Sequence, residues 1–139
     1  MQGALGVVTD RPLDVPAHLQ AVSVPAAGGH VLFCGVIRDH DHDRAVREIE
    51  YLAHPSAQDV LHEVVADFAA RPEVLVVTAS HRVGPLVIGD VALVAAISSV
   101  HRGPAFELCG ELVDELKARL PIWKRQIFTD GSDEWVNCP

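Results

Sequence analysis

The sequence predicts a single α+β domain, spanning residues 1–139, with a mixed and largely antiparallel sheet and two main helices. Apolar runs typical of strands are interspersed with two long segments of helical periodicity, at residues 55–70 and 101–120. Strands and helices do not alternate regularly, as they would in a parallel βαβ fold. The chain is long enough for one hydrophobic core, and no repeat, low-complexity tract or linker divides it.

The first quarter of the chain predicts two strands and a short helix. Residues 5–9 read as an opening strand, and Asp14 followed by Pro16 indicates a capped helix start. Residues 26–29 predict a turn. The apolar run at residues 30–38 then predicts a central strand covered on both faces.

The remaining elements follow from the same patterns. Residues 46–52 alternate polar and apolar side chains, so they predict a strand with one solvated face. The helix at 55–70 presents apolar residues at helical spacing and ends at Arg71-Pro72. Further strands are expected at residues 74–80 and 91–99, with short closing strands at 127–128 and 135–136.

The charge and cysteine content limit the possible partners and compartments. The formal net charge is −8, which argues against general affinity for nucleic acid or anionic membranes. No apolar run approaches a membrane span, and the N-terminus lacks the pattern of an export signal. The cysteines (Cys34, Cys109 and Cys138) are odd in number and widely spaced, which suits reduced thiols. We therefore expect a cytoplasmic protein.

A cluster of cations stands out in this acidic chain: four lie within nine positions, from Lys117 to Arg125. Pro121 must break the helix that carries Lys117, so Lys124 lies on the following element. Both lysines can still converge on one pocket. Neighbouring cations and partial burial lower the pKa of a lysine, which can then act as a nucleophile or proton carrier. The alternative is an ordinary helix C-terminus, where cations favour the helix dipole.

Other cations are placed to bind an anion. His101 and Arg102 precede a predicted helix N-terminus, where backbone N–H groups favour anions. Arg38 ends a predicted strand and could converge on the same place, or form a surface ion pair. The loop at residues 39–43 alternates aspartate and histidine, but it lacks a partner motif for a closed metal site. A solvated hairpin loop is favoured there, and no metal or other cofactor is expected.

In order along the chain, several segments resemble the large, catalytic subunit of molybdopterin synthase. These segments are Phe33-Cys34-Gly35-Val36-Ile37-Arg38-Asp39-His40, Glu50-Tyr51, His81-Arg82-Val83-Gly84, Ser98-Ser99-Val100-His101-Arg102, Ala105-Phe106-Glu107 and, above all, Leu116-Lys117-Ala118-Arg119-Leu120-Pro121-Ile122-Trp123-Lys124. The resemblance implies an α/β hammerhead-type fold. It also implies a homodimer within a heterotetramer, with a small ubiquitin-like sulfur carrier docked at each end. The C-terminal Gly-Gly thiocarboxylate of the carrier would donate sulfur to cyclic pyranopterin monophosphate (precursor Z), forming the molybdopterin dithiolene in molybdenum cofactor biosynthesis.

The resemblance assigns roles to particular residues. Lys117 and Lys124 would be the catalytic lysines, with Lys117 nearest the sulfur transfer, either covalently or as acid/base, and Lys124 stabilising charge. Substrate contacts or lining positions would be Val36, Ile37, Arg38, His101, Arg102, Arg125 and Gln126. Gln126 stands where the family usually has an acidic residue. Two other functions remain open: a non-catalytic paralogue that binds the carrier, and a metal-dependent phosphoesterase built on residues 39–43.

Overall fold

The computed structural model describes residues 5–137, so Cys138 lies outside the described residues. Three helices and nine strands occur in this range. The helices are α1 (Val15–Val22), α2 (Ala57–Ala69) and α3 (Arg102–Arg119). The strands are β1 (Val8–Thr9), β2 (Gly29–Val36), β3 (His40–Asp41), β4 (Arg44–Ala53), β5 (Val76–Arg82), β6 (Gly84–Val87), β7 (Val91–Ser99), β8 (Ile122–Phe128) and β9 (Asp133–Asn137). The expected α+β class is confirmed.

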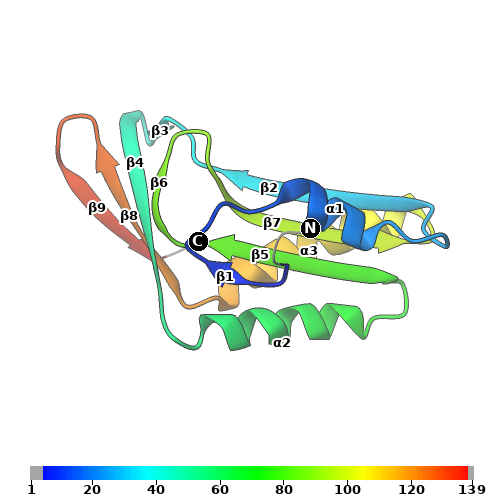
Figure 1. The fold of residues 1–139 in the computed structure, drawn as a ribbon. Coiled ribbons are helices and arrows are strands. Elements are labelled where there is room, and N and C mark those ends of the chain that lie inside the picture. The colour runs from blue at the N-terminus through cyan, green and yellow to red at the C-terminus, as the bar shows by residue number, and fades with distance from the viewer. Residues whose placement is uncertain (1–4, 138–139) are drawn as a thin grey trace.

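The first sheet forms the body of the molecule, with the strand order β1-β5-β7-β2. The pair β1 and β5 is parallel, and the other pairs are antiparallel. Helix α1 covers one face, while α3 and α2 pack on the other (Figure 1). The predicted cap of α1 is confirmed, because the Asp14 carboxylate accepts a hydrogen bond from the Ala17 N–H at 3.0 Å.

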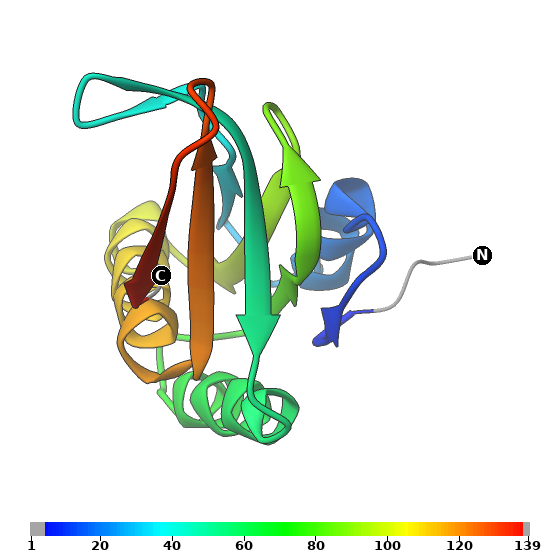
Figure 2. The same ribbon diagram turned by 90° about the vertical axis from the view of Figure 1, so that its left-hand side faces the viewer.

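The second sheet stands across one end of the first, as Figure 2 shows. Its strand order is β3-β4-β8-β9, and β6 pairs with β4 as well. The long strand β4 is antiparallel to both β6 and β8. Since α3 leads directly into β8, this sheet holds the chain that follows Pro121 close to the C-terminal end of α3.

Strand β7, rather than β2, is the central strand of the first sheet. β7 pairs with both β2 and β5, and its residues from Ala92 to Ser99 are all buried. The apolar run at 30–38 was expected to be covered on both faces. Helices α1 and α3 both contact β2, but none of the residues of β2 is buried, and Phe33 and Val36 are 36% and 51% exposed. The expected central position of this strand was wrong, because β7 is the only strand that pairs with β2 among the described residues. An apolar run therefore does not by itself show that a strand is central or fully covered.

The closing strands are longer than the sequence indicates. We expected a short strand at residues 127–128, but β8 begins at Ile122, immediately after Pro121. The local sequence does not predict this strand, because its first half is rich in cations. The hydrogen bonds that define β8 are made with β4 and β9, which the local sequence pattern does not include. Strand β6 lies between two of the expected strands, in a segment for which the sequence predicted no strand.

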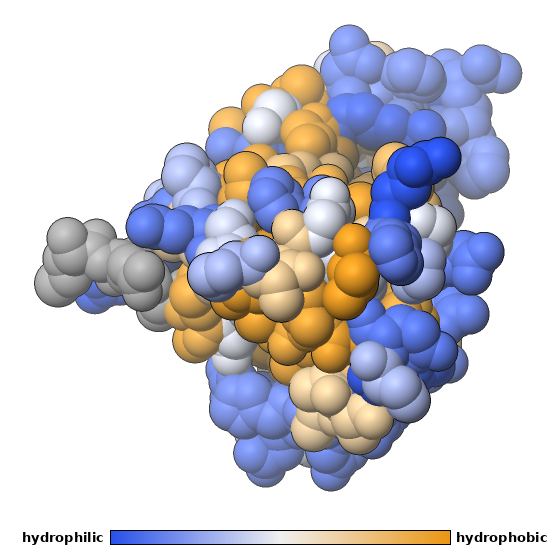
Figure 3. All heavy atoms as spheres, turned by 90° about the vertical axis from the view of Figure 1, so that its right-hand side faces the viewer, coloured by the Kyte–Doolittle hydropathy of each residue, from blue (hydrophilic) through white to orange (hydrophobic). Residues whose placement is uncertain are grey.

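No helix among residues 5–137 is long and apolar enough to cross a membrane. The end of the molecule where α3 begins carries apolar side chains bordered by polar ones (Figure 3). Close to the start of α3, Val100 is 51% exposed and Phe106 is 64% exposed. Exposed apolar side chains gathered in this way are typical of an interaction surface.

The turn before β2 requires glycine at position 28. A Cβ atom built there would lie 2.0 Å from the backbone oxygen of Val100, and the Gly28 N–H donates to the Ser99 carbonyl at 3.1 Å. We expect Gly28→Ala to lower the free energy of unfolding by about 1–3 kcal/mol, the range typical of overpacking, as measured by urea denaturation.

Gly110→Ala is the matched control for this prediction. Gly110 lies within α3, and nothing lies within 4 Å of the position its Cβ would take. We expect this variant to be more stable than the parent by about 0.5–1 kcal/mol, because alanine is the better helix former. Equal stability of Gly28→Ala and the parent protein would contradict the described packing of the turn.

Candidate active site

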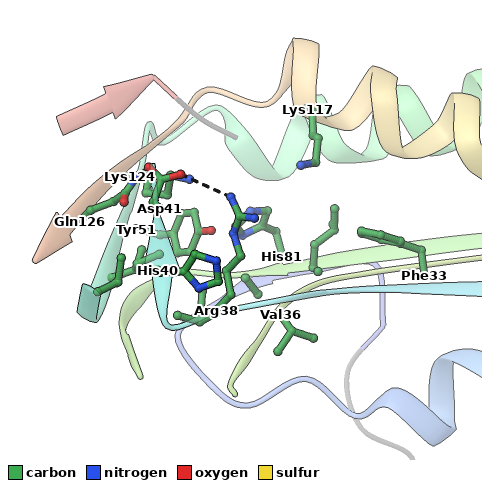
Figure 4. Close-up of a pocket in the computed structure, with 16 residues that line it drawn as sticks. Phe33, Val36, Arg38, His40, Asp41, Tyr51, His81, Lys117, Lys124 and Gln126 are labelled. Atoms are coloured by element: carbon green, nitrogen blue, oxygen red, sulfur yellow. Dashed lines mark hydrogen bonds and ion pairs between the residues drawn. The ribbon is translucent and has the colours of Figure 1, made fainter. Parts of the chain in front are cut away.

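A pocket of about 240 Å³ lies where the two sheets meet the end of α3 (Figure 4). The end of β2, the β3–β4 hairpin, β8 and the last turn of α3 all contribute to it. The sixteen lining residues are Phe33, Gly35, Val36, Ile37, Arg38, His40, Asp41, Val46, Ile49, Tyr51, His81, Ala92, Leu93, Lys117, Lys124 and Gln126.

Lys117 and Lys124 enter this pocket from two different elements, as their positions around Pro121 predict. Lys117 lies in the last turn of α3, which ends at Arg119, and Leu120 is already extended. Lys124 lies on β8, directly opposite Tyr51 of β4. Neither ammonium has a carboxylate within 4.0 Å among the described residues, whereas Arg119 on the same helix contacts three carboxylates. Both lysine charges are therefore available to a bound anion.

The pocket carries more positive than negative charge, in contrast to the chain as a whole. Its lining includes three cations, Arg38, Lys117 and Lys124, but only one carboxylate, that of Asp41. Asp41 lies 3.4 Å from the Arg38 guanidinium. The hydrogen bond from Gln126, and then the charges of His42, Lys124 and Arg38, lower the pKa of the Asp41 carboxyl, so it stays ionised. A net positive pocket remains.

His81 is a buried, neutral imidazole in the wall of the pocket. It is 1% exposed and stacks edge-on against Tyr51, with ring centres 5.0 Å apart. Burial, and to a lesser extent the charge of Lys117, lower the pKa of His81 to about 4. Its Nδ1–H donates to the Arg82 carbonyl at 2.7 Å, so Nε2 carries the lone pair. His81 therefore adds no charge near neutral pH.

Gln126 connects β8 to the β3–β4 hairpin. Its side-chain Nε2 donates to the Asp41 carboxylate at 3.0 Å. A carboxylate at position 126 would face Asp41 at that distance, and two like charges so close disfavour each other. An amide at this position is therefore explained by the acidic residue opposite it.

Six of the nine residues predicted for the site line the pocket, and three do not: His101, Arg102 and Arg125. His101 and Arg102 are exposed at the opposite end of α3. Fifteen residues of helix separate Arg102 from Lys117, a distance of about 22 Å. Arg125 follows Lys124 on β8, and alternate side chains of a strand point to opposite faces. Its guanidinium instead contacts Asp133 at 2.6 Å and Glu50 at 3.9 Å.

Sequence reasoning did not assign Asp41, Tyr51 or His81 to the site. Tyr51 could have been found from the alternation in β4, which predicts the face that it shares with Ile49. The positions of His81 and Asp41 in the pocket depend on strand pairing between distant segments, and no local sequence pattern predicts that pairing. His40 also lines the pocket, and its Nδ1 lies 2.7 Å from the Asp39 carboxylate.

The segment at residues 39–43 is a tight hairpin, as favoured. Its turn residues His42 and Asp43 both have positive φ, 47° and 65°, a geometry that aspartate tolerates better than most residues. Within residues 5–137, no group of three or more histidine, cysteine, aspartate or glutamate side chains is arranged to hold a metal ion. Burial raises the pKa of the Cys34 and Cys109 thiols, which disfavours thiolate chemistry there.

Several curated proteins similar to this chain are molybdopterin synthase catalytic subunits. The chain is 38% identical over 129 residues to the molybdopterin synthase catalytic subunit of Aspergillus niger, covering 92% of this chain and 72% of that protein. It is 38% identical over 130 residues to catalytic subunit 1 of Mycobacterium tuberculosis, covering 93% and 88%. The Arabidopsis thaliana subunit is 35% identical over 120 residues, and the chain spans 61% of its length.

Solved structures share the fold. Molybdopterin synthase from Staphylococcus aureus superposes with a TM-score of 0.83 at 27% identity, covering 94% of each chain. The molybdopterin biosynthesis MoaE protein of Burkholderia ambifaria gives a TM-score of 0.77 at 29% identity, covering 95% of this chain and 88% of that one. The family model described as MoaE protein matches residues 8–119. With most of its length matched, the chain belongs to the MoaE protein family.

Proposed function

We propose that this chain is the catalytic subunit of a molybdopterin synthase. In this reaction, a small ubiquitin-like carrier protein donates sulfur from its C-terminal Gly-Gly thiocarboxylate to precursor Z. Two transfers build the dithiolene of molybdopterin and open the cyclic phosphate. The names of the similar proteins support the activity, and the pocket described above supports the chemistry.

The charge of the pocket is the observation that carries the proposal. An anionic phosphate and an anionic thiocarboxylate must meet in one place, so the site needs fixed cations. Arg38, Lys117 and Lys124 line one pocket in a chain whose formal net charge is −8. Neither lysine is neutralised by a carboxylate of the described residues within 4.0 Å. Cations whose positions are fixed before the ligand binds do not have to reorganise during the reaction.

We assign the role nearest the sulfur transfer to Lys117 and charge stabilisation to Lys124. Lys117 is exposed at the pocket and lies close enough to the buried His81 to affect the pKa of that imidazole. Its amine can act there covalently or as acid/base. The charge of Lys124 helps to lower the pKa of the Asp41 carboxyl, so Lys124 acts on charge within the pocket.

The partner is a small carrier protein whose tail enters this pocket. A structure from Helicobacter pylori, described as a complex of subunits 1 and 2 of molybdopterin-converting factor, shares the fold with a TM-score of 0.73 at 17% identity. That resemblance concerns the fold alone. The carrier assignment rests on the family and on the cationic pocket, which suits a C-terminal thiocarboxylate.

We further propose that His101 and Arg102 reach a pocket of a second copy of the chain in a homodimer. Within one chain they lie about 22 Å from Lys117 along α3. Exposed Val100 and Phe106 flank them, an arrangement typical of residues that become buried in an interface. A two-fold interface would bring the start of each α3 toward the other protomer.

Substitution of Lys117 tests its assignment as the catalytic residue. We expect Lys117→Ala to reduce formation of molybdopterin from thiocarboxylated carrier and precursor Z by about a hundredfold or more, the effect typical of losing a catalytic group. Carrier binding on a sizing column should persist. Arg119→Ala is the matched control, because Arg119 lies on the same turn but ion-pairs outside the pocket; it should stay active.

Product from the parent protein and not from Lys117→Ala would support both the function and the site. If the parent protein binds the carrier but makes no product, the chain is a non-catalytic paralogue instead. In that case the lysine pair is ordinary charge at a helix end.

Mixing two impaired variants tests whether a second copy of the chain contributes Arg102 to the pocket. Lys117→Ala and Arg102→Ala should each be impaired alone. Mixing them under conditions that allow subunit exchange should restore roughly a quarter of the parent activity, because half of the dimers then contain one intact site of two. Molybdopterin formation by the mixture measures this. No recovery, despite exchange verified by native mass spectrometry, would exclude a contribution from the second copy.

A further inference from the structure

We infer that Asp41 is a positioning residue: its carboxylate, fixed by Gln126 of β8, holds the Arg38 guanidinium at the mouth of the pocket before an anion binds. Asp41 acts through Arg38 rather than by contact with the ligand. The inference rests on the proposed function for the identity of that ligand, precursor Z. It explains why a carboxylate lies among the cations that are expected to bind an anion.

The two oxygens of the Asp41 carboxylate face different partners. Oδ2 accepts a hydrogen bond from Gln126 Nε2 at 3.0 Å. Oδ1 lies 3.4 Å from Arg38 Nη2, and Figure 4 shows the arginine side chain reaching toward it. One oxygen is thus tied to β8, and the other meets a side chain that follows the end of β2. From its place in the β3–β4 hairpin, the carboxylate connects these two elements.

The support is buried, whereas the arginine is largely in solvent. Gln126 is 2% exposed, and the Asp41 side chain is 20% exposed. The Arg38 side chain is 72% exposed, and Asp41 is the only carboxylate that forms an ion pair with it among residues 5–137. A long exposed side chain loses rotamer freedom when a ligand orders it, which weakens binding. A partner that orders the side chain beforehand removes part of that loss.

The contact with Asp41 leaves most donors of Arg38 free. A guanidinium has five N–H groups, and within the described part of the chain only Nη2 has a carboxylate partner. The other N–H groups can donate to a phosphate, to which arginine binds in a bidentate geometry. The hydrogen bond from Gln126 and the neighbouring cations lower the pKa of the Asp41 carboxyl, so it is charged near neutral pH.

Simple electrostatics predicts the opposite effect for Asp41. A carboxylate in a pocket for an anion repels that anion, so removal of its charge would strengthen binding. If Asp41 orients Arg38, removal of the charge weakens binding instead, because the ligand itself then has to order the guanidinium. The direction of the change therefore distinguishes the two effects.

Titration calorimetry with precursor Z, in the absence of the carrier, measures this direction. Asp41→Asn keeps the shape and an oxygen that can accept from Gln126, but it removes the charge that attracts Arg38. We expect this variant to bind precursor Z about fivefold more weakly, the effect of ordering one long side chain.

Asp43→Asn is the matched control. It removes a carboxylate from the same hairpin, where Asp43 is exposed and does not line the pocket. Asparagine tolerates the positive φ of 65° at this position. The control variant should bind precursor Z no more weakly than the parent protein.

An Arg38→Ala background tests whether Asp41 acts through Arg38. If it does, adding Asp41→Asn will not weaken binding further, so the effects of the two substitutions will be non-additive. A merely structural role of Asp41 in the hairpin would weaken binding by the same factor in both backgrounds.

Weaker binding that depends on Arg38 supports the inference. Unchanged or tighter binding by Asp41→Asn, or equal losses with and without Arg38, overturns it, as does a parent protein that binds no precursor Z. Failure of the proposed function has a different signature. The parent protein would then make no molybdopterin from thiocarboxylated carrier, whatever the effect of Asp41→Asn on the binding of precursor Z.

Discussion

The break between α3 and β8 is the constraint on which the pocket depends. Pro121 cannot continue the helix, because it lacks an N–H and its ring clashes with the preceding turn. Its carbonyl accepts a hydrogen bond from the His54 N–H at 2.9 Å, which ties the break to the end of β4. Pairing of β8 with β4 then sets Tyr51 opposite Lys124. Two lysines seven residues apart thus reach one pocket from different directions.

The electrostatics of the site follow from this arrangement. Three cations share the lining with one carboxylate, and the remaining titratable groups are controlled by burial or by hydrogen bonds. Burial keeps His81 neutral, and the amide of Gln126 helps to keep Asp41 ionised. Arg119, only two residues from Lys117, is paired with surface carboxylates instead. The local positive charge of the pocket therefore depends on which cations of this acidic chain lack a carboxylate partner.

Sequence patterns predicted the helices, the capped start of α1, the end of α3 and the convergence of the two lysines, because each depends on residues close together in the chain. Strand edges and pairing could not be predicted in this way. The apolar run of β2 predicted the strand, but it did not predict the partial exposure of its residues or its place at the edge of the sheet. Arg125 was assigned to the site by the family resemblance, and the alternation of side chains along β8 turns it away from Lys124. His101 and Arg102 were grouped with Arg38 by charge, although α3 separates them.

The central claim is that Lys117 and Lys124 act on one bound anion. A double-mutant cycle on precursor Z binding, using Lys117→Ala, Lys124→Ala and the double variant, tests it most directly. If both lysines contact the same ligand, the effects of the two substitutions will be non-additive, with a coupling of about 0.5 kcal/mol or more. Strictly additive effects, or no loss of binding in either single variant, would contradict the account.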